Sequence, residues 1–481
     1  MKIPISHLID VYGDFDFVDS PVRIGRLHYD RLRGRDVYSF RFHSPFLLAF
    51  PGIPLSYDLS FHGLESFSSG AIFRCFGDCL PDRWGRALID KRERLRVGAN
   101  GVPRVFDDFG YLMQLDDRCR MGAFRFVKDG VLVGRPDPQR NIPIIEDIRS
   151  LVWEAQRFEE SLKDGKPLRM EWVDNLWRQG SSLGGVRPKA NVVDEGGNLC
   201  IAKFPSINDV YDIALWEHFA SRLAASAGIE TADTRLLAVP GFDNHALLSR
   251  RFDRVGSRRV HYASALTLTG LRDGDNASNG KGYLDIVNAV IGGGFAEPSA
   301  TLSQLFRRVA FNICIGNHDD HFRNHGFLLT KEGWRLSPAF DMNPTNSLVQ
   351  SLLINESTSE SSLPSLLSSC ESYFLEIGEA RRIVSEVLDA VSRWRVVADS
   401  CGISRREQER FAARFSKHVL VGMSRPVRQS PGQAISLSEG DKAIVGGGFR
   451  REVSQGEGKR KEREKREKKP EAPGKKVGRR R

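Results

Sequence analysis

Alternating apolar and polar residues predict β-hairpins in the first half of the chain. Residues 23–30 and 36–42 alternate in this way and are separated by RLRGR, a pattern typical of two strands and a turn. A second pair of strand-like runs, 190–194 and 199–204, is joined by a Gly-Gly turn. Residues 1 to about 130 therefore look β-rich with helical pieces, and the polar, proline-containing stretch at 134–141 indicates a boundary.

Apolar residues four positions apart predict a helix after the second hairpin. Within 212–228 one helical face carries Leu215, Phe219, Leu223 and Ala227. Gly228 ends that pattern, and strand-like runs at 234–239 and 245–252 follow. The order hairpin, helix, strand pair predicts a small sheet crossed by one helix.

After about residue 259 the pattern becomes mainly helical. Residues 301–316 have the apolar spacing of a helix that Gly316 closes, and further helices are expected between about 370 and 418. A hairpin is predicted from 326–330 and 334–336. The polar segment NHDDHFRN (317–324) is therefore a loop at a helix end, which the hairpin joins to SPAFDMNP.

Composition excludes several classes of protein. With 40% hydrophobic and 27% charged residues over 481 positions, the chain has the composition of a globular protein with room for a large core. No apolar run approaches the roughly 20 residues of a membrane span, and the acidic start is unlike a secretory signal, so we expect a cytoplasmic protein. Seven cysteines without a CxxC pair favour reduced thiols over disulfides or zinc.

The net charge of +10 is a property of the C-terminal end. Residues 459–481 contain thirteen Lys and Arg against four Glu, a surplus of nine. The segment has almost no apolar residues, so we expect a disordered, solvated tail. The alternative is an electrostatic grip on RNA, DNA or an acidic partner.

A glycine-containing segment before the second hairpin has the composition of a phosphate-binding loop. In QGSSLGGVRPKA (179–190) the glycines let backbone N–H groups turn toward an anion, and Arg187 and Lys189 add positive charge. An ordinary flexible turn is the alternative, because short glycine motifs are common.

Alternation places Lys203 on the same face of a predicted strand as the apolar residues Leu199 and Ile201, at the end of the strand. Such a lysine either extends harmlessly to water or lies over a nucleotide phosphate as a point charge. Glu217, on the helix expected to cross this sheet, is placed to orient it, although a solvent-exposed glutamate is the default there.

The densest cluster of functional groups is the loop His318-Asp319-Asp320-His321, followed by Arg323 and Asn324. Phosphoryl transfer requires a carboxylate that accepts the hydroxyl proton, and an Asp and an Asn that hold magnesium. Asp319 is the candidate base, and Asn324 and Asp341 are the candidate metal ligands. A solvated turn, or histidines capping the preceding helix, is the alternative.

Two other functions remain open from the residues alone. The first is a phosphohydrolase with a transition metal bound by the loop residues His318, Asp319, Asp320, His321 and His325. It leaves Lys203 and the 179–190 loop without a role. The second is a catalytically silent kinase fold that acts as a binding module or corepressor, with its basic tail touching DNA.

Several segments, in order and at this spacing, resemble the HipA family of bacterial toxin kinases. They are SSLGGVRPKA, CIAKFP, LLSRRFDR, GNHDDHFRN and SPAFDMNP, with CLPDRWGR and MGAFRF in the N-terminal region. The resemblance covers about residues 1 to 420. It implies an α+β, protein-kinase-like two-lobed fold with an N-terminal β-rich subdomain and a mainly helical C-terminal lobe.

The resemblance also implies domain boundaries and roles. The expected parts are an N-terminal subdomain (1–135), a small lobe with phosphate loop and hinge (136–258), a helical large lobe with the catalytic and metal loops (259–424) and the tail (425–481). Asp319 resembles the catalytic aspartate, with Asn324 and Asp341 as Mg²⁺ ligands. The ATP-binding positions are Gly184, Gly185, Val186, Arg187, Pro188, Lys189, Lys203, Arg250, Arg251, Phe252, His321, Arg323, Asn324 and Asp341.

Regulation and partners follow from the same resemblance. Ser182 matches a serine that family members autophosphorylate to switch themselves off, and Ser181 beside it is a second candidate. Arg323 stands where a lysine is more usual, and Arg250 where a glutamate is common. The implied activity is ATP- and Mg²⁺-dependent phosphorylation of Ser or Thr on a protein, in some members an aminoacyl-tRNA synthetase. The implied partner is a HipB-like DNA-binding antitoxin, through which any DNA contact would be indirect.

Overall fold

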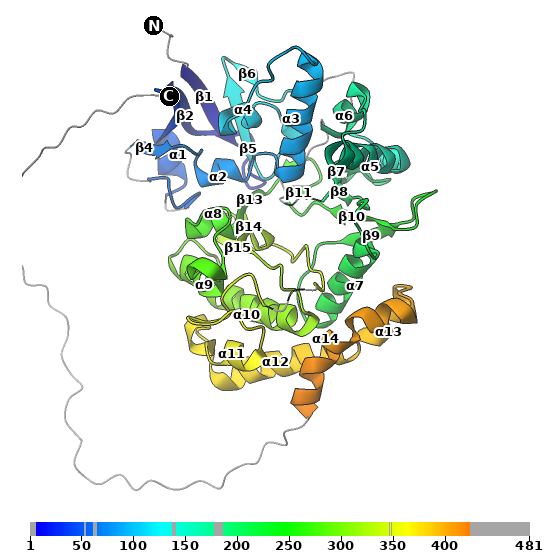
Figure 1. Ribbon diagram of the computed structural model, residues 1–481. Coiled ribbons are helices and arrows are strands. Elements are labelled where there is room, and N and C mark those ends of the chain that lie inside the picture. The colour runs from blue at the N-terminus through cyan, green and yellow to red at the C-terminus, as the bar shows by residue number, and fades with distance from the viewer. Residues whose placement is uncertain are drawn as a thin grey trace, which may run out of the picture. The chain divides into compact units, whose positions relative to one another are not determined.

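The N-terminal subdomain is built on an antiparallel sheet of six strands in the order β4-β3-β2-β1-β5-β6 (Figure 1). The expected hairpin is confirmed, because Gly25 to Leu32 pair with Phe42 to Arg35. One face is buried through alternating residues such as Val11, Leu27 and Phe40. The strands are β1 (Ser6–Gly13), β2 (Val22–Leu32), β3 (Arg35–Phe42), β4 (Ser66–Ser69), β5 (Phe124–Lys128) and β6 (Val131–Leu132).

Four helices accompany this sheet. They are α1 (Ser44–Ala49), α2 (Arg74–Gly77), α3 (Arg83–Val97) and α4 (Asp108–Leu112). The segment CLPDRWGR runs into α3, and Asp82 caps this helix by accepting from the backbone N–H of Gly85 at 2.7 Å. The inward side of α3 does not pack on the N-terminal sheet alone, since Trp84 and Leu88 belong to the hydrophobic core of the small lobe.

The small lobe contains a four-stranded antiparallel sheet in the order β7-β8-β10-β9. Its strands are β7 (Lys189–Val193), β8 (Leu199–Lys203), β9 (Thr234–Leu237) and β10 (Ala246–Arg250), and its helices are α5 (Ile148–Asp164), α6 (Met170–Trp177) and α7 (Ile213–Ser226). The predicted hairpin, helix and strand pair are confirmed. A short hairpin, β11 (Arg254–Val255) with β12 (Arg258–Arg259), leads to the large lobe.

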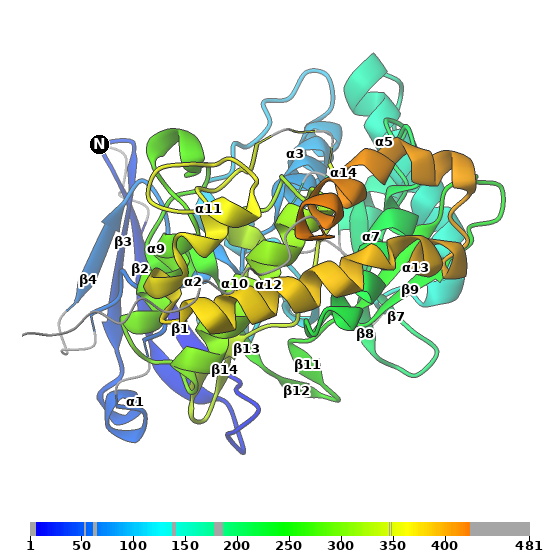
Figure 2. The same cartoon turned by 90° about the horizontal axis from the view of Figure 1, so that it is seen from below.

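The large lobe is mainly helical, as expected. The sheet β13 (His261–Ser264), β14 (Gly326–Thr330) and β15 (Gly333–Leu336) contains the predicted hairpin. Helix α10 runs through the middle of this lobe beside α12 and α14 (Figure 2), and its residues Leu305, Phe306 and Val309 are fully buried. The helices are α8 (Ala265–Thr269), α9 (Tyr283–Ile291), α10 (Pro298–Ile315), α11 (Leu363–Leu367), α12 (Ile377–Ser392), α13 (Trp394–Ser400) and α14 (Arg405–Met423).

The computed structural model describes residues 6–51, 54–60, 65–136, 141–177, 185, 187–345, 347 and 349–423. Residues 1–426 form one compact unit, separate from 427–481. The expected tail and the residues Ser181, Ser182, Gly184 and Val186 lie outside the described residues. Within the described part, no helix is both long and apolar enough to cross a membrane.

Candidate active site

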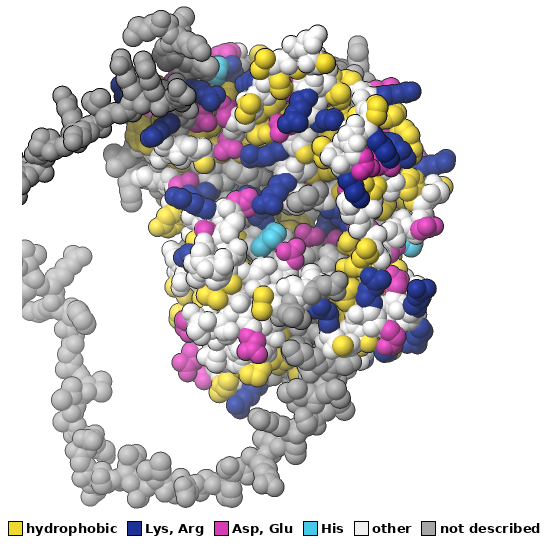
Figure 3. All heavy atoms as spheres, viewed as in Figure 1, with side chains coloured by type: hydrophobic (Ala, Val, Ile, Leu, Met, Phe, Trp, Pro, Cys, Tyr) yellow, Lys and Arg dark blue, Asp and Glu magenta, His cyan; other side chains and the backbone are white. Residues whose placement is uncertain are grey.

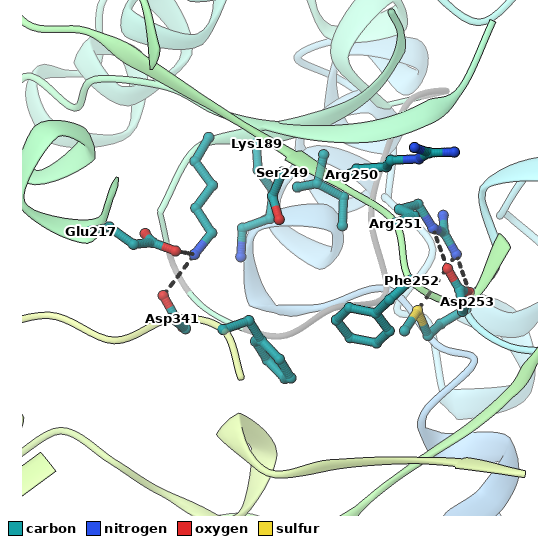
Figure 4. Close-up of a pocket in the computed structure, with 12 residues that line it drawn as sticks. Lys189, Glu217, Ser249, Arg250, Arg251, Phe252, Asp253 and Asp341 are labelled. Carbon is teal, nitrogen blue, oxygen red and sulfur yellow. Dashed lines mark hydrogen bonds and ion pairs between the residues drawn. The ribbon is translucent and has the colours of Figure 1, made fainter. Parts of the chain in front are cut away.

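A pocket lies where the small lobe, the expected hinge (Arg250, Arg251 and Phe252) and the large lobe meet. On the face in Figure 3 the surface is hollowed between the upper and lower halves, and acidic, basic and histidine side chains gather there. The pocket is lined by Met121, Lys189, Ile201, Lys203, Glu217, Ser249, Arg250, Arg251, Phe252, Asp253, Phe340 and Asp341 (Figure 4). Segments far apart in sequence therefore converge, as the predicted phosphotransfer site requires.

At one end of this pocket, Lys203 lies between two carboxylates. Its Nζ donates to Glu217 Oε1 at 2.6 Å and to Asp341 Oδ1 at 2.8 Å, the pair of dashed lines at the amine in Figure 4. Burial alone would lower the pKa of Lys203, but the two carboxylates outweigh it and raise the pKa above its ordinary value. The amine is therefore a fixed positive charge, held by a helix residue from one side and by the loop after β15 from the other.

Asp341 is held in an uncommon backbone conformation. Its φ is 58°, in the left-handed region, where a non-glycine residue costs on the order of 1–3 kcal/mol. Burial would raise its pKa, but the ammonium of Lys203, with Lys189 and His321, lowers it well below the ordinary range. Asp341 is thus an ionised carboxylate, as a metal ligand must be.

The loop between α10 and β14 presents Asp319 at the surface and buries its neighbour Asp320. Loss of hydration raises the pKa of Asp319, His321 opposes that change, and the negative charges of Asp341 and Asp320 add to it. Asn324 donates its Nδ2 to the backbone oxygen of Asp319 at 3.4 Å. This contact uses the amide nitrogen, so the amide oxygen is the atom suited to a metal.

Asp320 stabilises the same loop through buried hydrogen bonds. Its Oδ2 accepts hydrogen bonds from the Tyr283 hydroxyl at 2.7 Å and from Asn312 Nδ2 at 2.8 Å, and lies 2.9 Å from His325 Nε2. These partners keep the pKa of Asp320 below its ordinary value despite burial. The loop is anchored through Asp320 while Asp319 stays exposed.

Lys189, the first residue of β7, lines the pocket, and its amine forms an ion pair with a residue at the start of α3. Its Nζ lies 3.2 Å from Asp82 Oδ2 at the start of α3, and both side chains are at most 5% exposed. Gly185 has a φ of 103°, and a Cβ there would lie 2.8 Å from the Lys189 amine, so glycine suits this position. Lys189 thus lines the pocket, and the backbone of Gly185 lies close to its amine.

Arg187 lies elsewhere than the phosphate-loop hypothesis supposes. Its guanidinium makes two hydrogen bonds to Asp209, at 2.8 and 2.6 Å, and it does not line the pocket. A paired arginine of this kind stabilises the turn after β8.

The hinge residues divide into two kinds. Phe252 lines the pocket and packs on Phe340 with ring centroids 5.6 Å apart. The guanidinium of Arg250 turns outward to Asn198 Oδ1 at 2.9 Å. Arg251 is buried, and its guanidinium bonds to Asp253 at 2.8 and 2.7 Å and to Asn191 at 2.8 Å, so this side chain has a structural role.

The histidine and aspartate cluster does not converge as the phosphohydrolase alternative requires. His325 is turned to Asp320, and His318 lies with Nδ1 3.5 Å from the guanidinium of Arg414. Across the described ranges, no group of three or more His, Cys, Asp or Glu side chains is arranged to hold a metal. Asn324 and Asp341 carry the oxygen atoms that a Mg²⁺ ligand requires.

Sequence reasoning missed buried carboxylates that support the site from the N-terminal subdomain and from the segment after β10. Asp82, Asp78 and Asp253 are buried carboxylates close to site residues, but none was a candidate. The signal for Asp82 was present, since Pro-Asp before a helix marks an N-cap. Its contact with Lys189, 107 positions later, has no local signature.

The chain is similar to known proteins in sequence and in fold. Residues 181–395 match the model of the HipA-like C-terminal domain family. Over these residues the chain is similar to HipA-like proteins. Among curated relatives, the serine/threonine-protein kinase toxin HipA of Shewanella oneidensis is 24% identical over 245 residues, 46% of this chain and 53% of the relative. A putative kinase of Haemophilus influenzae is 25% identical over 182 residues, 34% of this chain and 52% of the relative.

The chain spans about half the length of the curated relatives it matches. A solved complex of HipA, HipB and operator DNA from Shewanella oneidensis contains a chain of similar fold. The TM-score is 0.59 at 18% identity, over 86% of this chain and 96% of that chain. The fold is therefore α+β and kinase-like, as the sequence resemblance implied.

Proposed function

We propose that this protein is an ATP- and Mg²⁺-dependent kinase that phosphorylates serine or threonine on a protein. The observation that carries the proposal is the position of Lys203 Nζ, between Glu217 at 2.6 Å and Asp341 at 2.8 Å in a pocket bounded by the hinge. A fixed amine beside an ionised carboxylate is the arrangement that phosphoryl transfer uses to hold nucleotide phosphates.

The side chains divide the work of transfer between them. Lys203, with Lys189 beside it, supplies the positive charge that holds the transferring phosphoryl oxygens, and Glu217 fixes the direction of Lys203. Asp319 accepts the proton of the substrate hydroxyl, a role favoured by its raised pKa. Asn324 and Asp341 would hold Mg²⁺, which when bound neutralises phosphate charge.

The biological role is proposed from the relatives. The curated Shewanella relative is named a kinase toxin, and the solved complex joins HipA to HipB on operator DNA. We propose by analogy a toxin that arrests growth by phosphorylating a protein target, with an aminoacyl-tRNA synthetase as the first candidate. A HipB-like antitoxin would be the partner and would mediate any DNA contact. Ser182 or Ser181 would be the autophosphorylated residue.

The substitution Asp319→Ala tests the reaction directly. Incubation with radiolabelled ATP and Mg²⁺ should label the wild-type protein, and mapping should place the label on Ser181 or Ser182. Asp319→Ala should bind ATP with nearly wild-type affinity, measured by calorimetry, because Asp319 does not line the pocket. Its transfer rate should fall by about a hundredfold or more, the range of a lost general base.

A control separates loss of the base from loss of any large-lobe carboxylate. Asp389 is exposed on α12, and Asp389→Ala should transfer phosphate at the wild-type rate. A wild-type protein that binds no ATP, or Asp319→Ala that transfers phosphate as fast as Asp389→Ala, would refute the assignment.

A further inference from the structure

Two buried carboxylates lie four residues apart between α2 and α3, and each contacts a different lobe. Asp78 and Asp82 are 6% and 8% exposed, and Leu80 and Pro81 between them are buried as well. We call residues 78–82 the strut. A buried carboxylate requires partners that satisfy it, so the contacts of the strut show what it holds.

The Asp82 end of the strut holds the small lobe. Asp82 Oδ2 lies 3.2 Å from Lys189 Nζ, while its Oδ1 caps α3 through the N–H of Gly85 at 2.7 Å. The N–H of Trp84, one residue before Gly85, donates to the carbonyl oxygen of Gly185 at 3.4 Å. The start of α3 thus contacts both the end of the glycine loop and the lysine that follows it.

The Asp78 end holds the large lobe beside the catalytic loop. Asp78 accepts from the backbone N–H and the hydroxyl of Ser264, both at 2.8 Å, and from the Thr267 hydroxyl at 2.7 Å. Ser264 caps α8, and the N–H of the following residue, Ala265, donates to the carbonyl oxygen of His325 at 2.7 Å. Arg323 approaches Asp78 more loosely, at 3.9 Å.

We propose that the strut positions the two halves of the phosphotransfer site relative to each other, with Asp82 and Asp78 as positioning residues. The inference rests on the proposed kinase function. Pro81 limits backbone freedom between the two carboxylates, so the strut fixes the separation between the Lys189 amine and the loop that carries Asp319. Transfer rates are sensitive to such placement, since an error of about 1 Å can cost about a hundredfold.

The first test is Asp82→Asn, which keeps the cap on α3 because asparagine is an equally good N-cap. Loss of the carboxylate charge should release the Lys189 amine, so kcat should fall and KM for Mg·ATP should rise, with kcat/KM reduced about tenfold to a hundredfold. The matched control is Asp107→Asn, because Asp107 caps α4 by accepting from the N–H of Gly110, and its other hydrogen bond, from the Tyr29 hydroxyl, also lies within the N-terminal subdomain. The control should retain the wild-type kcat/KM.

A double substitution separates positioning from general loss of stability. If Asp82 acts through Lys189, then Asp82→Asn should have little further effect on kcat/KM in a Lys189→Met background. If Asp82→Asn lowers kcat/KM by the same factor in the Lys189→Met background as in wild type, the proposal is overturned. A kcat/KM for Asp82→Asn equal to that of Asp107→Asn would overturn it as well.

Hydrogen exchange tests the strut without using the kinase reaction. In the protein without nucleotide, Asp82→Asn should speed exchange in residues 187–193, and Asp78→Asn should speed it in 318–326, each relative to Asp107→Asn. Wild-type protein that transfers no phosphate while these exchange changes occur would reject the kinase function alone. Wild-type transfer with unchanged exchange in both variants would reject the strut alone.

Discussion

His261 is a buried base among aromatic rings. Its ring centroid lies 4.1 Å from that of Phe124, 5.6 Å from Trp334 and 5.7 Å from Phe15. Nδ1 is positioned to accept from the N–H of Ala123 at 3.4 Å, and Nε2 has no hydrogen-bond partner among the described residues. Burial lowers the pKa of His261 to about 3, although the negative charge of Asp253 opposes the change.

This histidine should make the protein sensitive to mild acid. The unfolded chain takes up a proton on His261 below a pH of about 6.5, whereas the folded protein does not until about pH 3. Stability is therefore lost as pH falls through this window, by about 1.4 kcal/mol per pH unit. Urea unfolding of wild type and His261→Phe at pH 7 and pH 5 should show an excess loss of about 2 kcal/mol in wild type. Equal losses in the two proteins would contradict this origin.

Individual site residues were predictable where their role follows from local pattern. Lys203 was placed by strand alternation with Ile201, and both line the pocket. Asp341 was placed by the hairpin that precedes it. Arg187 shows the limit of this approach: its charge suggested a phosphate ligand, but the turn after β8 brings Asp209 within 2.6 Å. Which carboxylate pairs with an arginine depends on packing that a single segment does not encode.

At the scale of elements, the loop that carries Asp319 is attached to helices by one buried network. Asp320 joins α9 through Tyr283 and α10 through Asn312. Gln350 extends the network, because its Nε2 donates to the Tyr283 hydroxyl at 3.0 Å and to the carbonyl oxygen of Asn317 at 2.9 Å. Because Asp320 is bonded to two helices, the loop is held in one conformation. This fixes the position of the exposed Asp319 next to Asp320.

Removal of the Tyr283 hydroxyl should loosen this attachment. Tyr283→Phe leaves a buried carboxylate and a buried amide each short of one partner, so the free energy of unfolding should fall by about 1–3 kcal/mol. The transfer rate should fall as well, while ATP affinity stays unchanged. The matched control is Tyr373→Phe, because the Tyr373 hydroxyl is buried with no hydrogen-bond partner in the described part of the chain. Urea unfolding and labelling rates that are equal for both variants would show that the network does not support the loop.

The elements themselves were largely predictable, but their order in space was not. The period-two pattern located β2 with β3 and β7 with β8, and the helical period located α7 and α10. Helices α5 and α6 were not predicted, although Leu151, Ala155 and Phe158 have helical spacing and are buried. The strand order β4-β3-β2-β1-β5-β6 depends on the long connection from β4 to β5, which no local pattern constrains.

At the scale of the whole molecule, the N-terminal subdomain is joined to the hinge by buried charges. Arg251 bonds to the carbonyl oxygens of Cys119 and Arg120 at 2.8 and 3.0 Å, and Asp253 accepts from the N–H of Gly122 at 2.8 Å. Two guanidiniums, those of Arg251 and Arg254, lower the pKa of Asp253 well below its ordinary value despite burial. These contacts, with the shared hydrophobic core, explain why residues 1–426 form one compact unit.

The same contacts predict how the unit unfolds. Arg251→Ala leaves Asp253 with one of its two arginine partners and removes the buried bonds to the carbonyl oxygens of Cys119 and Arg120, so we expect the free energy of unfolding to fall by about 3–5 kcal/mol. Arg250→Ala is the control at the neighbouring position, because its exposed bond to Asn198 should contribute about 1 kcal/mol or less. Since Arg251 connects the small lobe to the N-terminal subdomain, calorimetry should show one transition that moves to lower temperature as a whole. Separate melting of the two parts in wild type, or equal shifts for the two variants, would show that the buried arginine does not couple them.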